Sequence, residues 1–491
     1  MTLLALNLHP ENIALLGSIL IIIAILINRI GARVGLPFLL LALIVGIVAG
    51  PDVLGIRFDD FHKAKSIGHL AMTIILFTAG FETSFAKTKP VFWHGVVLST
   101  VGLLLTVAAS GFFIYFALGK SLGATLMGSF MLAAILSSTD SASVFSILRS
   151  RRLHLRENLG NLLELESGSN DPIASTLTII LVSFTRYPFS VAHSSGYAAS
   201  LALGVLSRQI LLGLAIGFVI GFLSRLILKH LRIQGGSLYA ILILSIGLLS
   251  SGLSELLEGN GLLAIYITAI IIGQMKDLGQ KKEVTNFFDG LTWLVQLVMF
   301  LMLGLLARPS LMLHSLLPAV CIGLFMMLVA RPAGVFLSLL PFKTLSVKAR
   351  LLTSWVGPKG AGPILFAIYP VVAGVNGGME IFNIVFVITL MSLLVQGTTL
   401  RPFAKMLHLC YDEDPKAETF GIEVPEEMGM LHDHTVSEDD LAGGSTLRDL
   451  SLPHGIRVMM VRRGDKFLIP HGSMQLYTGD KLIIIMGETD D

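Results

Sequence analysis

A short run of charged and small polar residues interrupts a hydrophobic stretch near residue 165, and it reads Glu164-Leu165-Glu166-Ser167-Gly168-Ser169-Asn170-Asp171-Pro172. A charge at bilayer depth costs from ~2.5 to over 10 kcal/mol, so such residues normally face a cavity, a partner or an ion. Ser167, Asn170 and Asp171 are spaced i, i+3 and i+4 on one helical face, with Glu166 beside them. This face suits hard cations and protons. Glu164 is expected to lie off it and to pack between helices.

The composition indicates a polytopic membrane protein. Of the 491 residues, 54% are hydrophobic and 14% are charged, and the mean hydropathy is +0.79. A soluble domain would carry about 25% charged residues. No basic segment precedes the first hydrophobic stretch, so we expect it to be retained rather than cleaved as a signal peptide. Two cysteines, Cys321 and Cys410, predict neither a disulfide framework nor a metal site, and the net charge of +2 does not suggest nucleic-acid binding.

About thirteen hydrophobic segments of roughly 20 residues are predicted. They start near residues 12, 36, 67, 91, 122, 159, 205, 237, 261, 290, 313, 350 and 381. Lys and Arg accumulate in short cytoplasmic loops. With the N-terminus outside, the cytoplasmic loops hold more than twice as many of them as the outer loops, so we predict an outside N-terminus and a cytoplasmic tail.

Two of the segments contain residues that interrupt a membrane helix. The fifth carries a polar cluster around Asp140, and the twelfth contains Gly357-Pro358-Lys359-Gly360-Ala361-Gly362-Pro363. If the two halves of the chain are inverted repeats, these segments occupy equivalent positions, which is typical of a transporter site. Asp140 and Lys359 are then expected to compensate the oppositely charged ends of the half-helices.

The chain changes character after Arg401. We predict a membrane domain over residues 1–409, an acidic linker over residues 410–442 and a small β-rich domain over residues 443–491, with strands at 456–461 and 481–486 separated by turns. A domain of about 45 residues buries little apolar surface and is only marginally stable by itself, so we expect it to dimerise or to dock on another part of the protein.

Three motifs together resemble the NhaP-type monovalent cation:proton antiporters of the CPA1 family. They are Ser138-Thr139-Asp140, Glu166-Ser167-x-x-Asn170-Asp171 and Val395-Gln396-Gly397-Thr398-Thr399-Leu400-Arg401-Pro402. The sequence after Asp140 and the RCK-C-like (TrkA-C) tail are most similar to the bacterial potassium/proton branch. The resemblance implies an all-α membrane fold of thirteen helices with inverted repeats and crossed broken helices, a small α+β tail domain, and a homodimer whose protomers each have a dimerisation domain and a moving core.

The resemblance also implies the roles of particular residues. Asp171 would bind cation and proton in turn, and Ser167, Glu166 and the Thr139 backbone would complete or support the ion site. Asn170 would engage Asp140, and Arg331 would pair with Glu166. The chain departs from the family pattern at Ser141, where many relatives have proline, and at Lys359, where arginine is usual. Lysine lacks the planar bidentate fork of arginine.

The expected function is electroneutral exchange of a monovalent cation, K⁺ favoured, for H⁺ by competition for Asp171. Asn170 stands where a second acid would carry another proton. One alternative is a Na⁺/H⁺ antiporter. Another is a cation channel gated by the tail domain, but the sequence contains no selectivity-filter motif such as TVGYG. No covalent chemistry, enzyme activity or cofactor is expected. The expected partners are a second copy, the lipid bilayer and a small ligand such as a nucleotide at the tail, in a bacterial inner membrane.

Overall fold

The computed structural model describes residues 10–34, 37–140, 153–186, 195–231, 235–275, 281–342, 344–412, 431–437, 439–441, 444–450, 456–463 and 466–486. The chain divides into two compact units, one ending at Tyr411 and one beginning at Asp412. We call the first the membrane unit and the second the tail domain. Each is described by itself.

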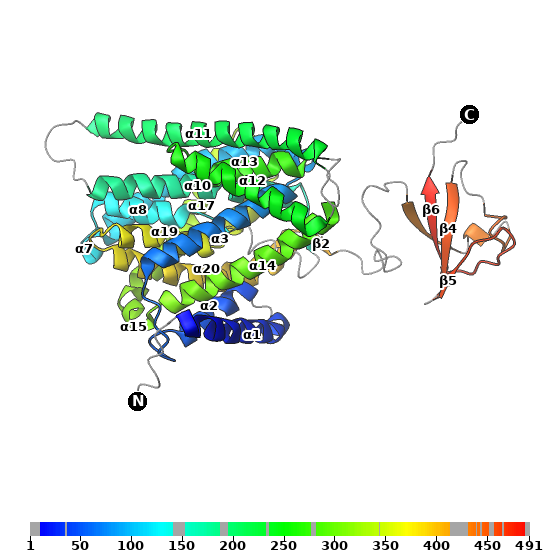
Figure 1. Cartoon of the computed structure of the whole chain (residues 1–491), viewed down its shortest axis with the longest axis horizontal. Coiled ribbons are helices and arrows are strands. Elements are labelled where there is room, and N and C mark those ends of the chain that lie inside the picture. The colour runs from blue at the N-terminus through cyan, green and yellow to red at the C-terminus, as the bar shows by residue number, and fades with distance from the viewer. Residues whose placement is uncertain are drawn as a thin grey trace. The chain divides into compact units, whose positions relative to one another are not determined.

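Helices build the membrane unit (Figure 1). In its first half they are α1 (Pro10–Val34), α2 (Phe38–Ala49), α3 (Phe61–Glu82), α4 (Phe85–Thr88), α5 (Phe92–Val97), α6 (Leu103–Phe113), α7 (Gly119–Leu122), α8 (Leu126–Ser137) and α10 (Leu159–Arg186). The helices of the second half are α11 (Ser195–His230), α12 (Gly236–Leu256), α13 (Gly261–Gly273), α14 (Lys281–Leu306), α15 (Pro309–Met312), α16 (Leu316–Phe325), α17 (Arg331–Ser338), α18 (Val347–Trp355), α19 (Ala361–Val372) and α20 (Gly378–Met406). Short 3₁₀ and π turns join α4 to α7 and α15 to α17 into continuous stretches.

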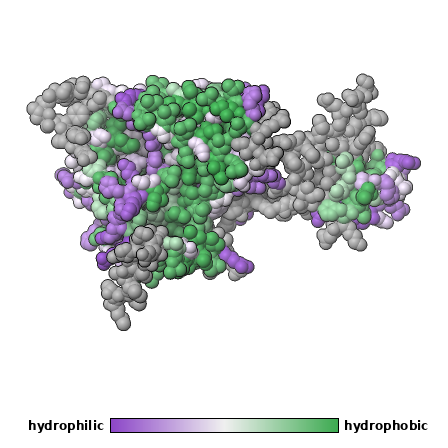
Figure 2. Space-filling view, in the orientation of Figure 1, coloured by the Kyte–Doolittle hydropathy of each residue, from purple (hydrophilic) through white to green (hydrophobic). Residues whose placement is uncertain are grey.

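Seven helical stretches in the described residues are long and apolar enough to cross a membrane, and five further apolar helices are shorter. Each predicted hydrophobic segment falls on a described helix. Large apolar side chains such as Leu203, Val219, Phe222 and Leu226 remain exposed on the helix surfaces. In Figure 2 apolar residues cover the middle of the visible face of the membrane unit, while polar residues gather toward the helix ends. An exposed apolar belt of this kind is a lipid-facing surface, and the protein is a multi-pass membrane protein.

The helices of the membrane unit form two groups. One group joins α4–α10 to α15–α20, through contacts such as α6 with α17 and α8 with α19. The other joins α1–α3 to α11–α14, where α2 packs on α14 and α3 on α13. Gly46 and Gly304 permit the α2–α14 contact, since a Cβ at Gly304 would lie 2.4 Å from the Leu43 carbonyl oxygen. Helices α3, α13 and α14 also contact α10 and α19, so the two groups meet along these helices.

Side-chain caps fix several helix starts. Asp60 accepts from Lys63 N at 2.9 Å, Asn260 from Leu263 N at 2.8 Å and Ser346 from Ala349 N at 3.0 Å. Such caps satisfy backbone donors that have no partner within the helix. Two short strands also pair in the described residues. β1 (Leu153–Leu155) pairs with β2 (Cys410–Asp412), so the segment after α20 is joined to the segment before α10.

The tail domain is a four-stranded antiparallel sheet of order β3-β6-β4-β5. Its strands are β3 (Leu431–Thr435), β4 (Ile456–Arg463), β5 (Lys466–Leu468) and β6 (Lys481–Met486). β3 lies inside the predicted linker and pairs with β6, Leu431 opposite Ile485, so the sheet includes residues before the predicted boundary at residue 443. The sequence of β3, Leu-His-Asp-His-Thr, is mostly polar and lacks the alternation of apolar and polar residues from which a strand is predicted. Residues 413–430 of that linker lie outside the described residues.

The buried carboxylate of Asp480 connects strand β4 of the tail domain to the turn that precedes strand β6. Asp480, 3% exposed, accepts from Arg463 Nη2 at 2.7 Å and from Tyr477 N at 2.9 Å. Burial alone would raise the pKa of Asp480, but the hydrogen bonds from Arg463 and from the Tyr477 backbone lower it below its usual value. The carboxylate therefore stays ionised at neutral pH and links β4 to the start of β6.

Candidate functional site

Two non-helical segments, one after α8 and one between α18 and α19, meet in the membrane unit. Helix α8 ends at Ser137, and the chain is non-helical from Ser138 to Asp140; residues 141–152, including Ser141, lie outside the described residues. The twelfth segment breaks between α18, which ends at Trp355, and α19, which begins after Gly360. The two breaks cross, since Asp140 N donates to the Pro358 carbonyl oxygen at 3.0 Å.

A charged side chain lies at each half-helix end. Lys359, 7% exposed, donates from Nζ to the Ser138 carbonyl oxygen at 3.0 Å, at the C-terminal end of α8. The Asp140 carboxylate lies against Gly360, where α19 begins, and a Cβ on that glycine would overlap it. A cation at a helix C-terminus and an anion at an N-terminus are both stabilising. The structure thus brings Asp140 and Lys359 to the ends at which the sequence pattern places them.

Asp171 lies on α10 beside this crossing. Its side chain is 8% exposed, and its Oδ1 accepts a hydrogen bond from Ser138 Oγ. Asp171 lines a cavity of about 30 Å³ together with Ser138, Thr139, Asp140 and Gln296. A water molecule needs about 10–15 Å³ of such volume. The cavity therefore has room for one or two waters, or for a small cation beside the carboxylate.

The opposite wall of the cavity is mainly apolar, with Gln296 of α14 as a polar residue in it. Its apolar part is formed by Leu39 of α2, Met72, Ile75, Leu76 and Ala79 of α3, and Met299 and Phe300 of α14. These helices belong to the group of α1–α3 and α11–α14, whereas the polar residues Ser138 to Asp140 and Asp171 belong to the other group. The cavity therefore lies at the boundary between the two helix groups.

Thr139 joins the broken helix to α10. Its carbonyl oxygen accepts from Ser167 Oγ at 2.5 Å, and its Oγ1 accepts from Asn170 Nδ2 at 2.5 Å. Asn170 was expected to engage Asp140 and instead contacts Thr139, one residue earlier, because the Asp140 carboxylate is turned toward Gly360. Ser167 and Asn170 thereby fix the position of the non-helical segment relative to Asp171.

Glu166 and Arg331 form a buried bidentate ion pair. Arg331 Nη1 lies 2.8 Å from Glu166 Oε1, and Nη2 lies 2.8 Å from Oε2; the side chains are 8% and 2% exposed. This is the pairing that the resemblance implied. Because both carboxylate oxygens are held by one guanidinium, Glu166 is a structural link between α10 and α17 rather than an open ligand.

Three buried residues near the crossing were not singled out from the sequence. Ser138 donates directly to Asp171, Ser392 Oγ accepts from Lys359 N at 2.8 Å, and Gln396 Nε2 donates to the Trp355 carbonyl oxygen at 2.9 Å. Ser138 and Gln396 lie in the motifs that carry the family resemblance, and their position in those motifs could have marked them as site residues. Ser392 is a single hydroxyl on an apolar helix, for which the sequence offers none.

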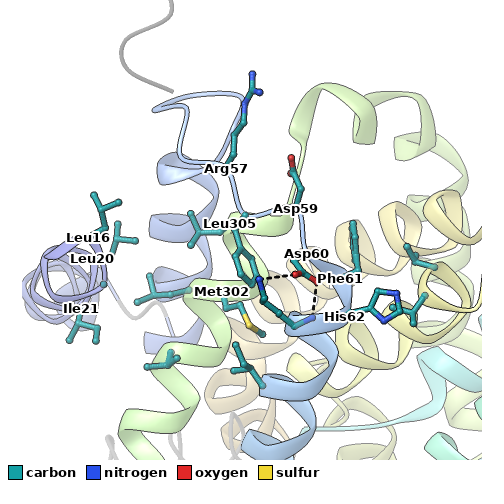
Figure 3. Close-up of a pocket in the computed structure, with 18 residues that line it drawn as sticks. Leu16, Leu20, Ile21, Arg57, Asp59, Asp60, Phe61, His62, Met302 and Leu305 are labelled. Atoms are coloured by element: carbon teal, nitrogen blue, oxygen red, sulfur yellow. Dashed lines mark hydrogen bonds and ion pairs between the residues drawn. The ribbon is translucent and has the colours of Figure 1, made fainter. Parts of the chain in front are cut away.

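A larger hollow lies elsewhere in the membrane unit (Figure 3). It has a volume of about 980 Å³ between α1, α14 and the loop before α3, with Leu16, Leu20 and Met302 among its apolar walls. The acids at its rim have basic partners: Asp59 lies 2.8 Å from Arg308 Nη2, and Asp60 lies 3.1 Å from Lys63 Nζ. These carboxylates are already neutralised, so the Asp171 cavity remains the better candidate for an ion site.

We predict that neutralising either partner of the Glu166–Arg331 pair alone will destabilise the protein by about 3–5 kcal/mol, because the other charge is then buried without its partner. Glu166→Gln and Arg331→Met should each lower the melting temperature in detergent, and the double variant should recover part of the loss. Strictly additive losses in the double-mutant cycle would contradict a direct coupling.

Comparison with known proteins agrees with this architecture. The family model described as sodium/hydrogen exchanger, transmembrane, matches residues 17–406, and the TrkA-C domain model matches residues 431–490. The K(+)/H(+) antiporter NhaP2 of Shewanella baltica is 35% identical over 479 residues, covering 96% of this chain and 80% of the relative. The K(+)/H(+) antiporter NhaP of Alkalimonas amylolytica is 35% identical over 462 residues, covering 93% and 75%.

A solved structure shares the fold. The sodium proton antiporter MjNhaP1 from Methanocaldococcus jannaschii superposes with a TM-score of 0.67 at 21% identity, covering 81% of this chain and 98% of that one. The family match runs from within α1 to the end of α20, and the tail match begins at the first strand of the sheet. The chain therefore belongs to the sodium/hydrogen exchanger family and carries a TrkA-C domain after its membrane unit.

Proposed function

We propose that the protein exchanges a monovalent cation, with K⁺ favoured, for H⁺ by competition between the two ions for Asp171. The observation that carries this proposal is the placement of Asp171: a buried carboxylate at the crossing of two broken helices, beside a cavity large enough for a small ion. Ser138, Ser167 and Thr139 supply or position the neighbouring oxygen atoms. Monovalent cations and protons are the ligands that such a set of oxygens accepts.

The competition follows from the cost of a buried charge. An ionised Asp171 without a cation is unfavourable in a cavity with an apolar wall, whereas a proton or a bound cation neutralises it. Only the two neutralised states are expected to pass the boundary between the helix groups readily. This constraint makes exchange obligatory and requires neither a covalent step nor a cofactor.

Electroneutral exchange is supported by the residue beside the carboxylate. Asn170 is an amide whose Nδ2 donates to Thr139, and it cannot carry a second proton. Glu166 is held by Arg331 through both oxygens. One carboxylate then carries one charge per cycle, so one H⁺ is exchanged for one cation.

The choice of K⁺ rests on relatives named K(+)/H(+) antiporters that match most of the chain. The alternative is Na⁺/H⁺ exchange, as in the name of the structurally similar archaeal protein. The oxygens around Asp171 do not by themselves select one ion size.

We further propose a homodimer in a bacterial inner membrane, with the N-terminus outside and the tail domain in the cytoplasm. The distribution of Lys and Arg supports the orientation. The tail domain would bind a small ligand such as a nucleotide and shift the membrane unit between conformations. A ligand can do so only if its affinity differs between the two conformations.

The first test is Asp171→Asn, which removes the alternating charge and keeps the shape. We expect cation-driven proton exchange in proteoliposomes to fall to the level of protein-free liposomes, because an amide cannot bind proton and cation in turn. Asp59→Asn, a change at an exposed acid, is the matched control and should exchange normally. Exchange retained by the Asp171 variant would place the ion site elsewhere. Comparing K⁺, Na⁺ and Li⁺ as the driving ion tests the preference.

The second test concerns stoichiometry. A membrane potential set by a gradient of a permeant anion should leave the initial exchange rate unchanged, because no net charge moves when one H⁺ is exchanged for one cation. The rate is measured with a pH-sensitive dye at equal ion gradients. Acceleration in proportion to the potential would contradict the single-carboxylate mechanism.

The third test is truncation after Tyr411, where the two units divide. We expect exchange to persist with a changed dependence on pH or cation concentration, because the removed domain holds none of the proposed transport residues. If the truncated protein keeps the profile of the full chain and loses only dimer stability, the tail domain is a dimerisation clamp and not a regulator.

A further inference from the structure

A second acid lies on the same side of α10 as Asp171. Glu164, Gly168 and Asp171 are spaced i, i+4 and i+7, which places them on one helical stripe, with Glu164 about 10 Å before Asp171 along the axis. The expectation that Glu164 lies off this face was wrong, because the seven-residue spacing brings it back to the Asp171 side. Glu164 therefore faces the boundary between the helix groups.

Thr83, which ends α3, connects Glu164 to the Asp171 cavity. Its Oγ1 lies 2.7 Å from Glu164 Oε1 and 2.8 Å from the Ala79 carbonyl oxygen. Ala79 lines the cavity that contains Asp171. The Glu164–Thr83 contact therefore lies one turn of α3 from the Asp171 cavity, toward the end of the membrane unit at which α10 begins.

The Thr83 hydroxyl has one hydrogen and two acceptors within reach. When its hydrogen points to Glu164, the Ala79 carbonyl is still satisfied by Thr83 N at 3.1 Å. When the hydrogen turns to Ala79, the hydroxyl presents a lone pair beside Glu164. The Thr83 hydroxyl can therefore donate a hydrogen bond to Glu164 when no cation is bound, and its oxygen can coordinate a cation bound at Glu164. Neither arrangement requires the backbone to move.

Tyr266 of α13 supplies a further oxygen. Its side chain is 1% exposed, and its hydroxyl lies close to both Glu164 and Thr83. The ring packs on Gly168, where a Cβ would lie 2.8 Å from the hydroxyl oxygen. The Tyr266 hydroxyl therefore lies between the positions of Glu164 and Asp171 along the axis of α10.

Pro172 frees a further oxygen on this path. It lies inside α10 and has no N–H, so the Gly168 carbonyl lacks the donor four residues on that an uninterrupted helix would provide. Gly168 stands between Glu164 and Asp171 on the stripe. Oxygen atoms therefore occur at each level from Glu164 to Asp171.

We propose that Glu164, Thr83 and Tyr266 form a second oxygen site, which holds the transported cation transiently between Asp171 and the end of the membrane unit where α10 begins. The inference rests on the proposed exchange function. A carboxylate and two hydroxyls suit a monovalent metal cation, and their position along the boundary gives the ion a station before the Asp171 cavity. The site is used in passage and does not change the number of protons exchanged.

The experiment measures the apparent KM for K⁺ separately at each face of the full-length protein, in inside-out and right-side-out vesicles with a pH-sensitive dye. Glu164→Gln should raise KM about three- to tenfold at the face where α10 begins, a loss of about 0.7–1.4 kcal/mol in apparent affinity, and leave the other face within about twofold. Thr83→Val, which keeps the side-chain shape, and Tyr266→Phe should produce smaller rises at the same face. Glu164→Asp should restore part of the affinity.

Glu255→Gln is the matched control, because Glu255 contacts His69, fourteen residues before Thr83 on α3 and about 21 Å away along that helix. It should leave KM at the α10 face unchanged. If folded Glu164→Gln and Thr83→Val proteins show the wild-type KM at both faces while Asp171→Asn is inactive, the second site is wrong and the exchange function stands. If Asp171→Asn remains active and Glu164→Gln does not, Glu164 is the main ion site and both proposals fail as stated.

Discussion

The absence of water in the bilayer core is the constraint on which this structure depends. A broken membrane helix leaves backbone donors and acceptors that lipid cannot satisfy. Here each break satisfies the other, because Asp140 N donates to the Pro358 carbonyl and Lys359 Nζ donates to the Ser138 carbonyl. The crossing fixes where Ser138 and Thr139 lie, and it thereby creates the polar side of the cavity around Asp171.

The acids near the crossing differ in how firmly they are held. Glu166 is bound by two charge-assisted hydrogen bonds to Arg331, and the Asp140 carboxylate lies against the start of α19. Asp171 accepts a hydrogen bond from a hydroxyl, Ser138 Oγ, which can rotate. A carboxylate held by a guanidinium resists exchange of its partner, whereas one that faces a hydroxyl and a cavity can accept an ion. The environment of each acid, rather than its residue type, separates scaffold from ion site.

The boundary between the two helix groups gives this arrangement a means of movement. The polar oxygens come from the segment after α8 and from α10, and the facing wall is made mainly of apolar side chains from α2, α3 and α14, together with Gln296 of α14. Apolar contacts are non-directional, so the two walls can shift past each other at the cavity, whereas the hydrogen bonds from Thr83 and Asn260 to α10 would have to open. Glu164, Thr83 and Tyr266 extend polar chemistry along the same boundary.

The sequence by itself determined the membrane class, the hydrophobic segments, the two interrupted helices and the charged residues at their breaks. These follow from local hydropathy and from glycine and proline, which act within a few residues. The pairing of Glu166 with Arg331 came from the family resemblance. Strand β3 escaped prediction because its pattern is polar and its partner, β6, is about fifty residues away. Only the tertiary structure decided that Ser138 donates to Asp171, that Asn170 contacts Thr139, and that Glu164 faces Thr83. These contacts join segments far apart in the chain, and their geometry depends on how whole helices pack, which no local pattern records.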